Sequence, residues 1–330
     1  MQYKVGIIGA TGLVGKEILS LLEKSEIQST NIFLFSSEKS IKEKIIFKNK
    51  KIALQLLDLD ILKTLDFIFF AAGSDISKKI IPLLKNQKPY CIDMSSAFRE
   101  EKDIPLIIPE INSHILNEKD KIIASPNCTT TILLMPLYNL HKEYKIKKII
   151  MSSYQAASGG GKKLIDKLLL DTKNAIKNNR FEDYGFNLFL HESKLHPNRY
   201  SEEEIKIINE TKKILDCKDI LINPTCVRVP VIRAHSIAIN VEFEKEFHIE
   251  KVYEILKKTK GIEIFEDYEN EKFATPLLAS KKNEVLVSRI RNDLTNPKAL
   301  DIWAVGDQLL KGAALNGFQI FELLKNKIGQ

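Results

Sequence analysis

The sequence predicts an α/β protein with an N-terminal doubly wound parallel sheet and a second α+β domain. Three observations predict this. Short apolar runs alternate with helical patterns over residues 1–127, a glycine-rich turn follows the first run, and longer β-like runs appear after residue 146. Strands that alternate with helices are typical of parallel sheets covered on both faces, and the early glycine turn makes the first domain Rossmann-like.

The first domain starts with a short apolar strand at residues 3–8. Gly9, Gly12 and Gly15 follow at three-residue spacing, and then Val14, Ile18, Leu21 and Leu22 recur at helical period. The residues after Gly9 therefore predict a tight turn into a helix. Further strands are expected at 31–37, 65–73, 90–96 and 121–127, with a helix at 76–86 between two of them.

The second domain has two long β runs, residues 147–158 and 227–244, with helical patterns at 161–177 and 201–216 between them. No strand pattern follows the amphipathic segment at the end of the chain. We therefore expect a C-terminal helix, 306–330, that packs back on the first domain. The predicted domains are 1–127, joined by that helix, and 128–305.

Composition sets limits on function. The net charge is +7, but lysines and glutamates are interspersed, which indicates a solvated surface more than a nucleic-acid site and also suits an anionic substrate. No apolar run reaches about 18 residues, and the first residues lack a signal-peptide pattern, so we expect a cytoplasmic protein without a membrane partner. The four cysteines have no CxxC spacing, so neither disulfides nor a metal site are expected.

The glycine turn suits a dinucleotide, because backbone amides and the positive end of a helix dipole can hold a pyrophosphate. A tight turn without a ligand is the alternative. After the second strand, the hydroxyls of Ser36 and Ser37 and the cation of Lys39 would accept a 2′-phosphate, which favours NADP(H). Glu38 is the acidic residue that would instead suit NAD.

The stretch "SPNCTTT" places Cys128 directly before the apolar run "ILLMPL". Asn127 is a good N-cap residue, so the thiol is expected in the first turn of a helix. Free amides and the helix dipole favour the thiolate there, which is the nucleophilic form. The alternative is an inert, buried cysteine.

A thiolate nucleophile needs a proton carrier, and His235 is the best candidate because it follows an arginine-rich β run. Arg228 lies seven residues earlier, so on one regular strand the two side chains would face opposite sides. Pro230 argues against a regular strand, and we expect a bend that lets both reach one pocket. His191 and His196 lie in a polar segment and are expected at the surface.

"SEEEIK" predicts a helix start with Ser201 as N-cap and Glu204 in a capping box. Glu203 and Lys206 then share one face, and an exposed salt bridge between them is the plain interpretation. The run "GGGKK" at 159–163 lacks the phosphate-loop pattern, and it is better explained by close approach to a cofactor or substrate.

These stretches together resemble the bacterial-type aspartate-β-semialdehyde dehydrogenases through nearly the whole chain. The motifs that match, in order, are "GATGLVG", "IDMSSAFR", "IPEIN", "SPNCTTT", "SSYQAASG", "EEIK", "NETKKIL", "TCVRVPV", "AHS", "RIRND" and "LLKGAALN". The resemblance implies a homodimer formed through the second, catalytic domain. It also implies NADPH-dependent reduction of L-aspartyl-4-phosphate to aspartate semialdehyde, with a cysteine thioester intermediate and no metal, in lysine, methionine and threonine biosynthesis.

The resemblance also implies roles for single residues. Cys128 matches the nucleophile, His235 the acid/base and Gln155 the residue that orients the reacting centre. Arg99 and Lys206 match the phosphate-binding cations, whereas Arg228 and Glu203 match the pair that holds the α-carboxylate and amino group. The implied cofactor contacts are Gly9, Thr11, Gly12, Leu13, Val14, Ser36, Ser37, Lys39, Gly73, Ser158, Gly159 and Gln308.

Two related alternatives stay open. N-acetyl-γ-glutamyl-phosphate reductase shares the glycine turn and a cysteine, although the "PNC" and "EEIK" contexts disfavour it. A catalytically inactive paralogue should have lost Cys128, Gln155 or His235, and all three are present. The chain departs from the common family pattern at Lys39, Ala71, Ile237 and Gln308.

Overall fold

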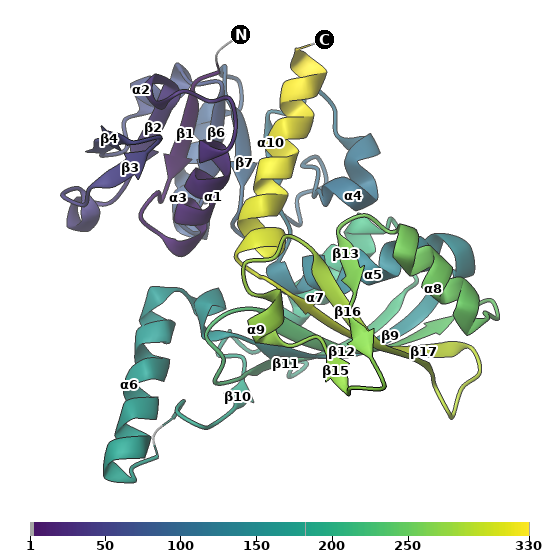
Figure 1. The fold of residues 1–330 in the computed structure, drawn as a ribbon. Helices are drawn as coiled ribbons and strands as arrows, with labels where there is room; N and C mark the ends of the chain where they lie inside the picture. The colour runs from purple at the N-terminus through teal and green to yellow at the C-terminus, as the bar shows by residue number, and fades with distance from the viewer. Residues whose placement is uncertain (1–2, 182, 330) are drawn as a thin grey trace. The chain divides into compact units, whose positions relative to one another are not determined.

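The computed structural model describes residues 3–181 and 183–329 and contains two compact units. The first unit is Met1–Asn127 together with Ala313–Gln330, and the second is Cys128–Gly312 (Figure 1). The second unit ends at residue 312 and not at 305, where the sequence pattern placed the boundary. Each unit has its own sheet and its own buried side chains.

The first unit is built on a six-stranded parallel sheet of order β5-β2-β1-β6-β7-β8. Its strands are β1 (Val5–Ile8), β2 (Ile32–Phe35), β5 (Leu54–Gln55), β6 (Phe67–Phe70), β7 (Tyr90–Asp93) and β8 (Ile122–Ala124). In chain order this is 3-2-1-4-5-6, the order of the dinucleotide-binding fold. The predicted doubly wound parallel sheet is therefore confirmed, and its strand order reverses between β1 and β6.

Helices and short turns surround this sheet. They are α1 (Leu13–Glu23), α2 (Leu59–Lys63), α3 (Ser74–Leu84), α4 (Pro109–Asn112) and the C-terminal α10 (Leu315–Ile328), with 3-10 turns Ser29–Asn31, Glu38–Ser40 and Ser113–Ile115. A small hairpin pairs β3 (Ile45–Phe47) with β4 (Lys50–Ile52). Phe321 of α10 packs edge-on against Phe67 of β6 at 4.8 Å between ring centroids, so the last helix belongs to the core of the first unit.

The predicted helix at 306–330 is wrong at its start. Residues 299–306 form a strand, β17 (Ala299–Gly306), whose last residue pairs with His235. Only Gly306 of the predicted helix lies in this strand, and residues 307–309 form a turn in which the Leu309 and Leu310 amides donate to Asp307 Oδ1. A π-helical turn, Leu310–Ala314, then leads into α10.

The second unit has a seven-stranded mixed sheet of order β10-β11-β9-β12-β17-β16-β13. Its other strands are β9 (Ile146–Gln155), β10 (Phe189–Leu190), β11 (Leu221–Arg228), β12 (His235–Phe243), β13 (Ile262–Ile264) and β16 (Val285–Asn292), and β14 (Glu266–Asp267) pairs with β15 (Lys272–Phe273). The β9–β11 and β13–β16 pairs are parallel, and the other pairs are antiparallel. The expectation of an α+β domain is confirmed.

Helices α5 (Cys128–Tyr144), α7 (Glu202–Ile214) and α8 (Ile249–Lys258) lie over one face of this sheet, and α6 (Lys162–Asn178) projects away from it (Figure 1). A 3-10 turn (Ala157–Gly160) precedes α6, and α9 (Pro276–Ala279) is short. The predicted capping box at the start of α7 is present: Ser201 Oγ accepts from the Glu204 amide, and the Glu204 carboxylate accepts from the Ser201 amide. Within the described residues, no helix combines the length and the apolar character that crossing a membrane requires.

Candidate active site

The ends of four neighbouring strands, β11, β9, β12 and β17, lie side by side in the sheet of the second unit. Gln155 is the last residue of β9, Arg228 is the last of β11 and His235 is the first of β12. The register pairs Arg228 with Gln155 and pairs His235 with Gly306 at the end of β17. Because neighbouring strands lie about 4.8 Å apart, polar residues at adjacent strand ends are held within contact distance. The structure therefore brings three of the predicted residues together.

The chain leaves the sheet between Arg228 and His235, as the odd spacing and Pro230 predicted. Residues 229–234 are not in a strand, and Ala234 has a φ of 74°, a left-handed conformation that is uncommon for a residue with a side chain. This bend turns both side chains to Gly159. A methyl group built on Gly159 would lie 3.1 Å from Arg228 Nη1 and 3.1 Å from His235 Nε2.

Cys128 is half-buried and is the first residue of α5, as predicted. Its neighbour Thr129 links it to the strand ends, because Gln155 Nε2 donates to Thr129 Oγ1 at 2.9 Å. The other end of the same amide, Oε1, accepts from Arg228 Nη1 at 3.2 Å. Gln155 is buried, so this one amide sets the spacing between the thiol-bearing helix turn and the guanidinium.

His235 is fully buried, and the Ala156 amide donates to its Nδ1 at 3.0 Å. A ring nitrogen that accepts has no proton, so we assign the proton of the neutral ring to Nε2. Burial, and then the charge of Arg228, hold the pKa of His235 well below its usual value of 6.5. Nε2 has no hydrogen-bond partner in the part of the chain that the structure describes, and it is therefore a donor available to a ligand.

The exposed salt bridge suggested for Glu203 and Lys206 does not fit the burial of the glutamate. Glu203 is buried, and its Oε1 accepts a long hydrogen bond, 3.4 Å, from Gln155 Nε2. The Lys206 ammonium instead lies 3.7 Å from Glu202, one helix turn before it. Glu203 therefore belongs to the buried cluster, and Lys206 is the half-buried cation beside it on α7.

The sequence placed His191 at the surface, whereas the structure shows a half-buried side chain in contact with Arg228. His191 follows β10, and its Nε2 lies 2.8 Å from Arg228 Nη2. Burial, with Arg228 and Lys206 as added cations and Glu203 opposing them, lowers the pKa of His191 to about 4. No local signal could reveal this, since the partner lies 37 residues away in the sequence.

Gln308 and Ser158, two of the predicted cofactor contacts, lie beside this cluster. The Gln308 amide donates to Ser158 Oγ, and its oxygen accepts from the Ala234 amide at 2.8 Å. Both side chains are buried, so Gln308 holds the residue before His235 against the turn that contains Gly159. Gly312 packs closely against Cys128, because a methyl group on this glycine would lie 2.7 Å from Cys128 Cβ.

Replacing Gly159 with alanine tests this packing. The added methyl group would meet Arg228 and His235 at 3.1 Å, which is tighter than most contacts, and the pair would have to move. We expect kcat/KM to fall about tenfold or more, because small displacements of reacting groups are costly. Gly160→Ala is the matched control, since the three atoms nearest to its methyl group all belong to Leu164, and neither Arg228 nor His235 is among them. An equal loss in both variants would assign the effect to loop distortion.

The first unit has its own candidate binding turn at the ends of β1 and β6. Gly9 has a φ of 87°, and a methyl group on it would lie 2.6 Å from the Ala71 carbonyl oxygen. A methyl group on Gly15 would lie 2.2 Å from the Gly9 carbonyl oxygen. Gly12 is the N-cap of α1 and supplies no side-chain cap. Only glycine fits this turn, and the start of α1 suits a pyrophosphate.

The other predicted cofactor residues of this unit lie around the same strand ends. The Gly9 amide donates to Phe35 at the end of β2, which places the turn beside Ser36. Gly73, with a φ of 91°, precedes α3 at the end of β6. Ser36 is buried, Thr11 is half-buried and Ser37 and Lys39 are exposed, while α1 begins at Leu13 and continues with Val14. These residues fit a dinucleotide that extends from β1 towards β2.

Arg99 belongs to the first unit and is buried there. Its Nε donates to the Ser125 carbonyl oxygen at 2.9 Å, and Nη2 donates to the Met94 carbonyl oxygen at 3.2 Å. These bonds hold the guanidinium against the backbone of Ser125 and Met94 within the first unit.

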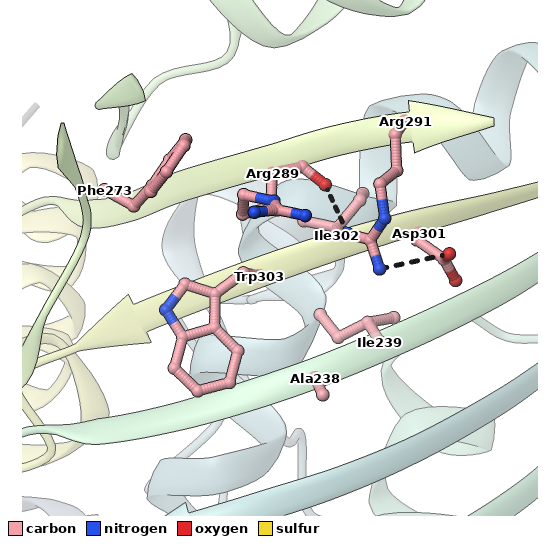
Figure 2. A pocket seen from close by; sticks show the side chains of 8 residues that line it. All are labelled: Ala238, Ile239, Phe273, Arg289, Arg291, Asp301, Ile302 and Trp303. Carbon is pink, nitrogen blue, oxygen red and sulfur yellow. Dashed lines mark hydrogen bonds and ion pairs between the residues drawn. The ribbon is translucent and has the colours of Figure 1, made fainter. Parts of the chain in front are cut away.

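A separate pocket of about 360 Å³ lies on the sheet of the second unit (Figure 2). It is lined by Ala238, Ile239, Phe273, Arg289, Arg291, Asp301, Ile302 and Trp303. Neither a cysteine nor a histidine lines it, and Arg291 is paired with Asp301 at 3.2 Å. The residues that line this pocket therefore lack the thiol and imidazole groups found beside the strand ends.

A dinucleotide-binding sheet together with a thiol, imidazole and guanidinium cluster is typical of oxidoreductases that handle an acyl group on cysteine. Residues 4–119 match the family model described as "Semialdehyde dehydrogenase, NAD binding domain", and residues 134–311 match "Semialdehyde dehydrogenase, dimerisation domain". The chain belongs to the semialdehyde dehydrogenase family. Its first unit is thus a nicotinamide-dinucleotide-binding domain.

Similar proteins agree with this assignment. A Prochlorococcus marinus protein named aspartate-semialdehyde dehydrogenase is 39% identical, covering 97% of this chain and 95% of its own. A Synechocystis protein of the same name is 38% identical, covering 97% of both chains. The crystal structure of aspartate semialdehyde dehydrogenase II from Vibrio cholerae superposes with a TM-score of 0.93 at 35% identity, over 99% of both chains. A second Vibrio cholerae structure, described as complexed with ASA, has the same TM-score at 34% identity and the same coverage.

Proposed function

We propose that this chain is an aspartate-semialdehyde dehydrogenase that reduces L-aspartyl-4-phosphate to L-aspartate-4-semialdehyde and releases phosphate. The observation that carries the proposal is the Gln155 amide, which joins the helix turn of Cys128 to the guanidinium of Arg228. A nucleophile and a carboxylate-binding cation are thereby held at a fixed spacing, as a short amino-acid substrate requires. Family membership and the names of the similar proteins support the same activity.

The chemistry follows from the side chains. The Cys128 thiolate attacks the acyl carbon, the C–O bond to phosphate breaks, and a thioester forms with phosphate as the leaving group. The bound nicotinamide cofactor supplies the hydride that reduces this thioester. Lys206 and Arg99 are the cations proposed for the phosphate, and Arg228 with Glu203 is the pair proposed for the α-carboxylate and the ammonium group. The start of α5 favours the thiolate form of Cys128.

His235 acts at the carbonyl oxygen. Its assigned Nε2 proton can donate to the oxygen that becomes negative during attack and reduction, which is the acid half of the acid/base role. Because the Ala156 amide occupies Nδ1, the ring is held in this tautomer. His235 therefore stabilises the tetrahedral intermediates and assists their collapse to the aldehyde.

The cofactor is proposed to be NADP(H). The first unit, Met1–Asn127 with Ala313–Gln330, binds it at the Gly9 turn, and Ser158, Gly159 and Gln308 of the second unit are the proposed contacts near the nicotinamide. Ser37 and Lys39 are exposed at the end of β2, where a 2′-phosphate would lie in this fold. Four free cysteines are consistent with work in the reducing cytoplasm.

We also propose a homodimer through the second unit. The matching family model is described as a dimerisation domain. Three apolar side chains of α6, Leu169, Leu170 and Ile176, are 51%, 57% and 72% exposed. Trp303, which lines the pocket on the sheet, and its neighbour Tyr154 are half-exposed aromatic residues of the same unit. Their ring centroids lie 5.6 Å apart. Large apolar surface of this kind is usually covered by a partner, and a second copy is the occupant that the family assignment supports.

The test runs the reaction backwards. The chain is mixed with aspartate semialdehyde, phosphate and NADP⁺, and the absorbance of the reduced cofactor is followed; we expect phosphate-dependent turnover. N-acetylglutamate semialdehyde is the competing substrate, and NAD⁺ is the competing cofactor. Faster turnover of the acetylated aldehyde would replace the proposal with the reductase of the longer acyl phosphate. If neither aldehyde is turned over, the alternative that the chain is a catalytically inactive paralogue would replace the proposal.

A further inference from the structure

His191 contacts Arg228, and no role has yet been given to this histidine. His191 follows β10, whose Phe189 pairs with Arg228 of β11, and its own amide donates to the Cys226 carbonyl oxygen at 2.9 Å. The backbone of the histidine is therefore fixed beside the strand that carries the arginine. Its ring extends to the guanidinium, where Nε2 lies 2.8 Å from Nη2.

The proton assignment of His191 follows from its partner. A guanidinium only donates, so Nε2 must accept, and the ring is neutral. Nδ1 also faces a donor, the Ser193 amide at 3.3 Å, but a neutral ring accepts at one nitrogen only. The shorter contact, with a charged donor, assigns the acceptor to Nε2 and weakens the contact with Ser193. The groups around the ring agree: burial, Arg228 and Lys206 all favour the neutral form, and only Glu203 and Glu204 oppose them.

The guanidinium of Arg228 is thus held by three acceptors. Nη1 donates to Gln155 Oε1 at 3.2 Å and to the Ala156 carbonyl oxygen at 3.3 Å, and Nη2 donates to His191. A guanidinium has five N–H groups, so two remain, one on Nε and one on Nη2. Nε has no partner within the described residues, although it is buried. An acceptor from a ligand would satisfy it.

We propose that His191 is a positioning residue that aims Arg228 at the substrate's α-carboxylate. This rests on the proposed function, in which Arg228 binds that group. A neutral acceptor at Nη2 fixes the rotation of the guanidinium plane about its stem without competing for the carboxylate, as an acidic residue would. His191 thereby sets affinity for the amino-acid end of the substrate, and the chemistry at Cys128 does not need it.

The experiment measures KM and kcat for aspartate semialdehyde in the phosphorylating direction. His191→Ala is expected to raise KM about tenfold, because a charged hydrogen bond loses its acceptor, while kcat changes less than about threefold. His191→Gln, whose amide oxygen can accept from Nη2, should restore most of the affinity. His196→Ala is the matched control, since that half-buried histidine of the same segment pairs with Glu202 and not with Arg228, and it should leave KM unchanged.

A double-mutant cycle with Arg228→Lys shows whether His191 affects KM through Arg228 or independently of it. Lysine lacks the fork that His191 orients, so adding His191→Ala to it should raise KM less than about twofold. A wild-type KM in His191→Ala, no rescue by glutamine, or a full tenfold effect in the Arg228→Lys background would each overturn the inference. Absence of turnover in the wild type would instead overturn the proposed function.

Discussion

Cys128→Ser is expected to lower turnover of aspartate semialdehyde at least about 1,000-fold, since the loss of a nucleophile removes the covalent route. A serine hydroxyl fits the same place at the start of α5, but it ionises far less readily than a thiol. The binding residues Arg228 and Glu203 stay in place, so the KM of the residual activity should change little. Steady-state rates of the two proteins check this directly.

Comparing the wild type with Cys128→Ser in the absence of phosphate tests for the acyl adduct on the thiol. When phosphate is left out, the wild type should form about one equivalent of reduced cofactor per active subunit and then stop, because the thioester has no acceptor. Mass spectrometry of peptides should place the acyl group on Cys128. Cys217→Ser is the matched control, since this half-exposed thiol lies at the end of α7, outside the strand-end cluster, and the variant should behave like the wild type. A burst that survives in Cys128→Ser would end the covalent mechanism.

His235→Asn is the second large effect, with kcat expected to fall about 100- to 1,000-fold. The asparagine oxygen can accept from the Ala156 amide in place of Nδ1, so the bend is preserved, but no donor remains at the position of Nε2. His235→Gln can place an amide N–H near that position and should lose less. Rates for the two variants that fall in the opposite order would contradict the donor role of Nε2.

The pH dependence tests the same assignment. Burial and Arg228 lower the pKa of His235 below 6.5, so the folded protein keeps this ring neutral as the pH falls through 6.5. A donor that is already neutral and protonated at Nε2 gives no change in kcat there. We therefore expect no inflection near pH 6.5 that depends on His235. An inflection in the wild type that disappears in His235→Gln would show a ring that titrates during turnover.

The parts of the site that the sequence predicted are those with local signals. Gly9 has a positive φ, Cys128 is the first residue of α5, and Ser201 with Glu204 forms a capping box that spans one helix turn. Each signal depends on neighbours within a few residues, and the structure shows each feature where the sequence placed it. The parallel sheet was predictable for the same reason, because its strands and helices alternate regularly.

The parts that it missed depend on distant neighbours. His191 reads as a surface residue until β10 pairs with β11 and brings Arg228 beside it. The spacing of "SEEEIK" suggested an exposed Glu203, and only the tertiary packing shows that this side chain is buried while Lys206 lies 3.7 Å from Glu202. The helix expected from residue 306 starts later because Gly306 still pairs with His235 of β12, and the Asp307 side chain accepts from the Leu309 and Leu310 amides in a turn.

The closeness of Gly312 to Cys128 has a consequence for compounds designed to react with the thiol. A single methyl group at residue 312 would already overlap the carbon that bears the sulfur, so that flank of the cysteine is closed. Electrophiles that are flat and unbranched at the reacting atom should therefore label the protein faster than branched ones of equal intrinsic reactivity. Selectivity for this enzyme over other reactive cysteines can thus be sought in the shape of the warhead.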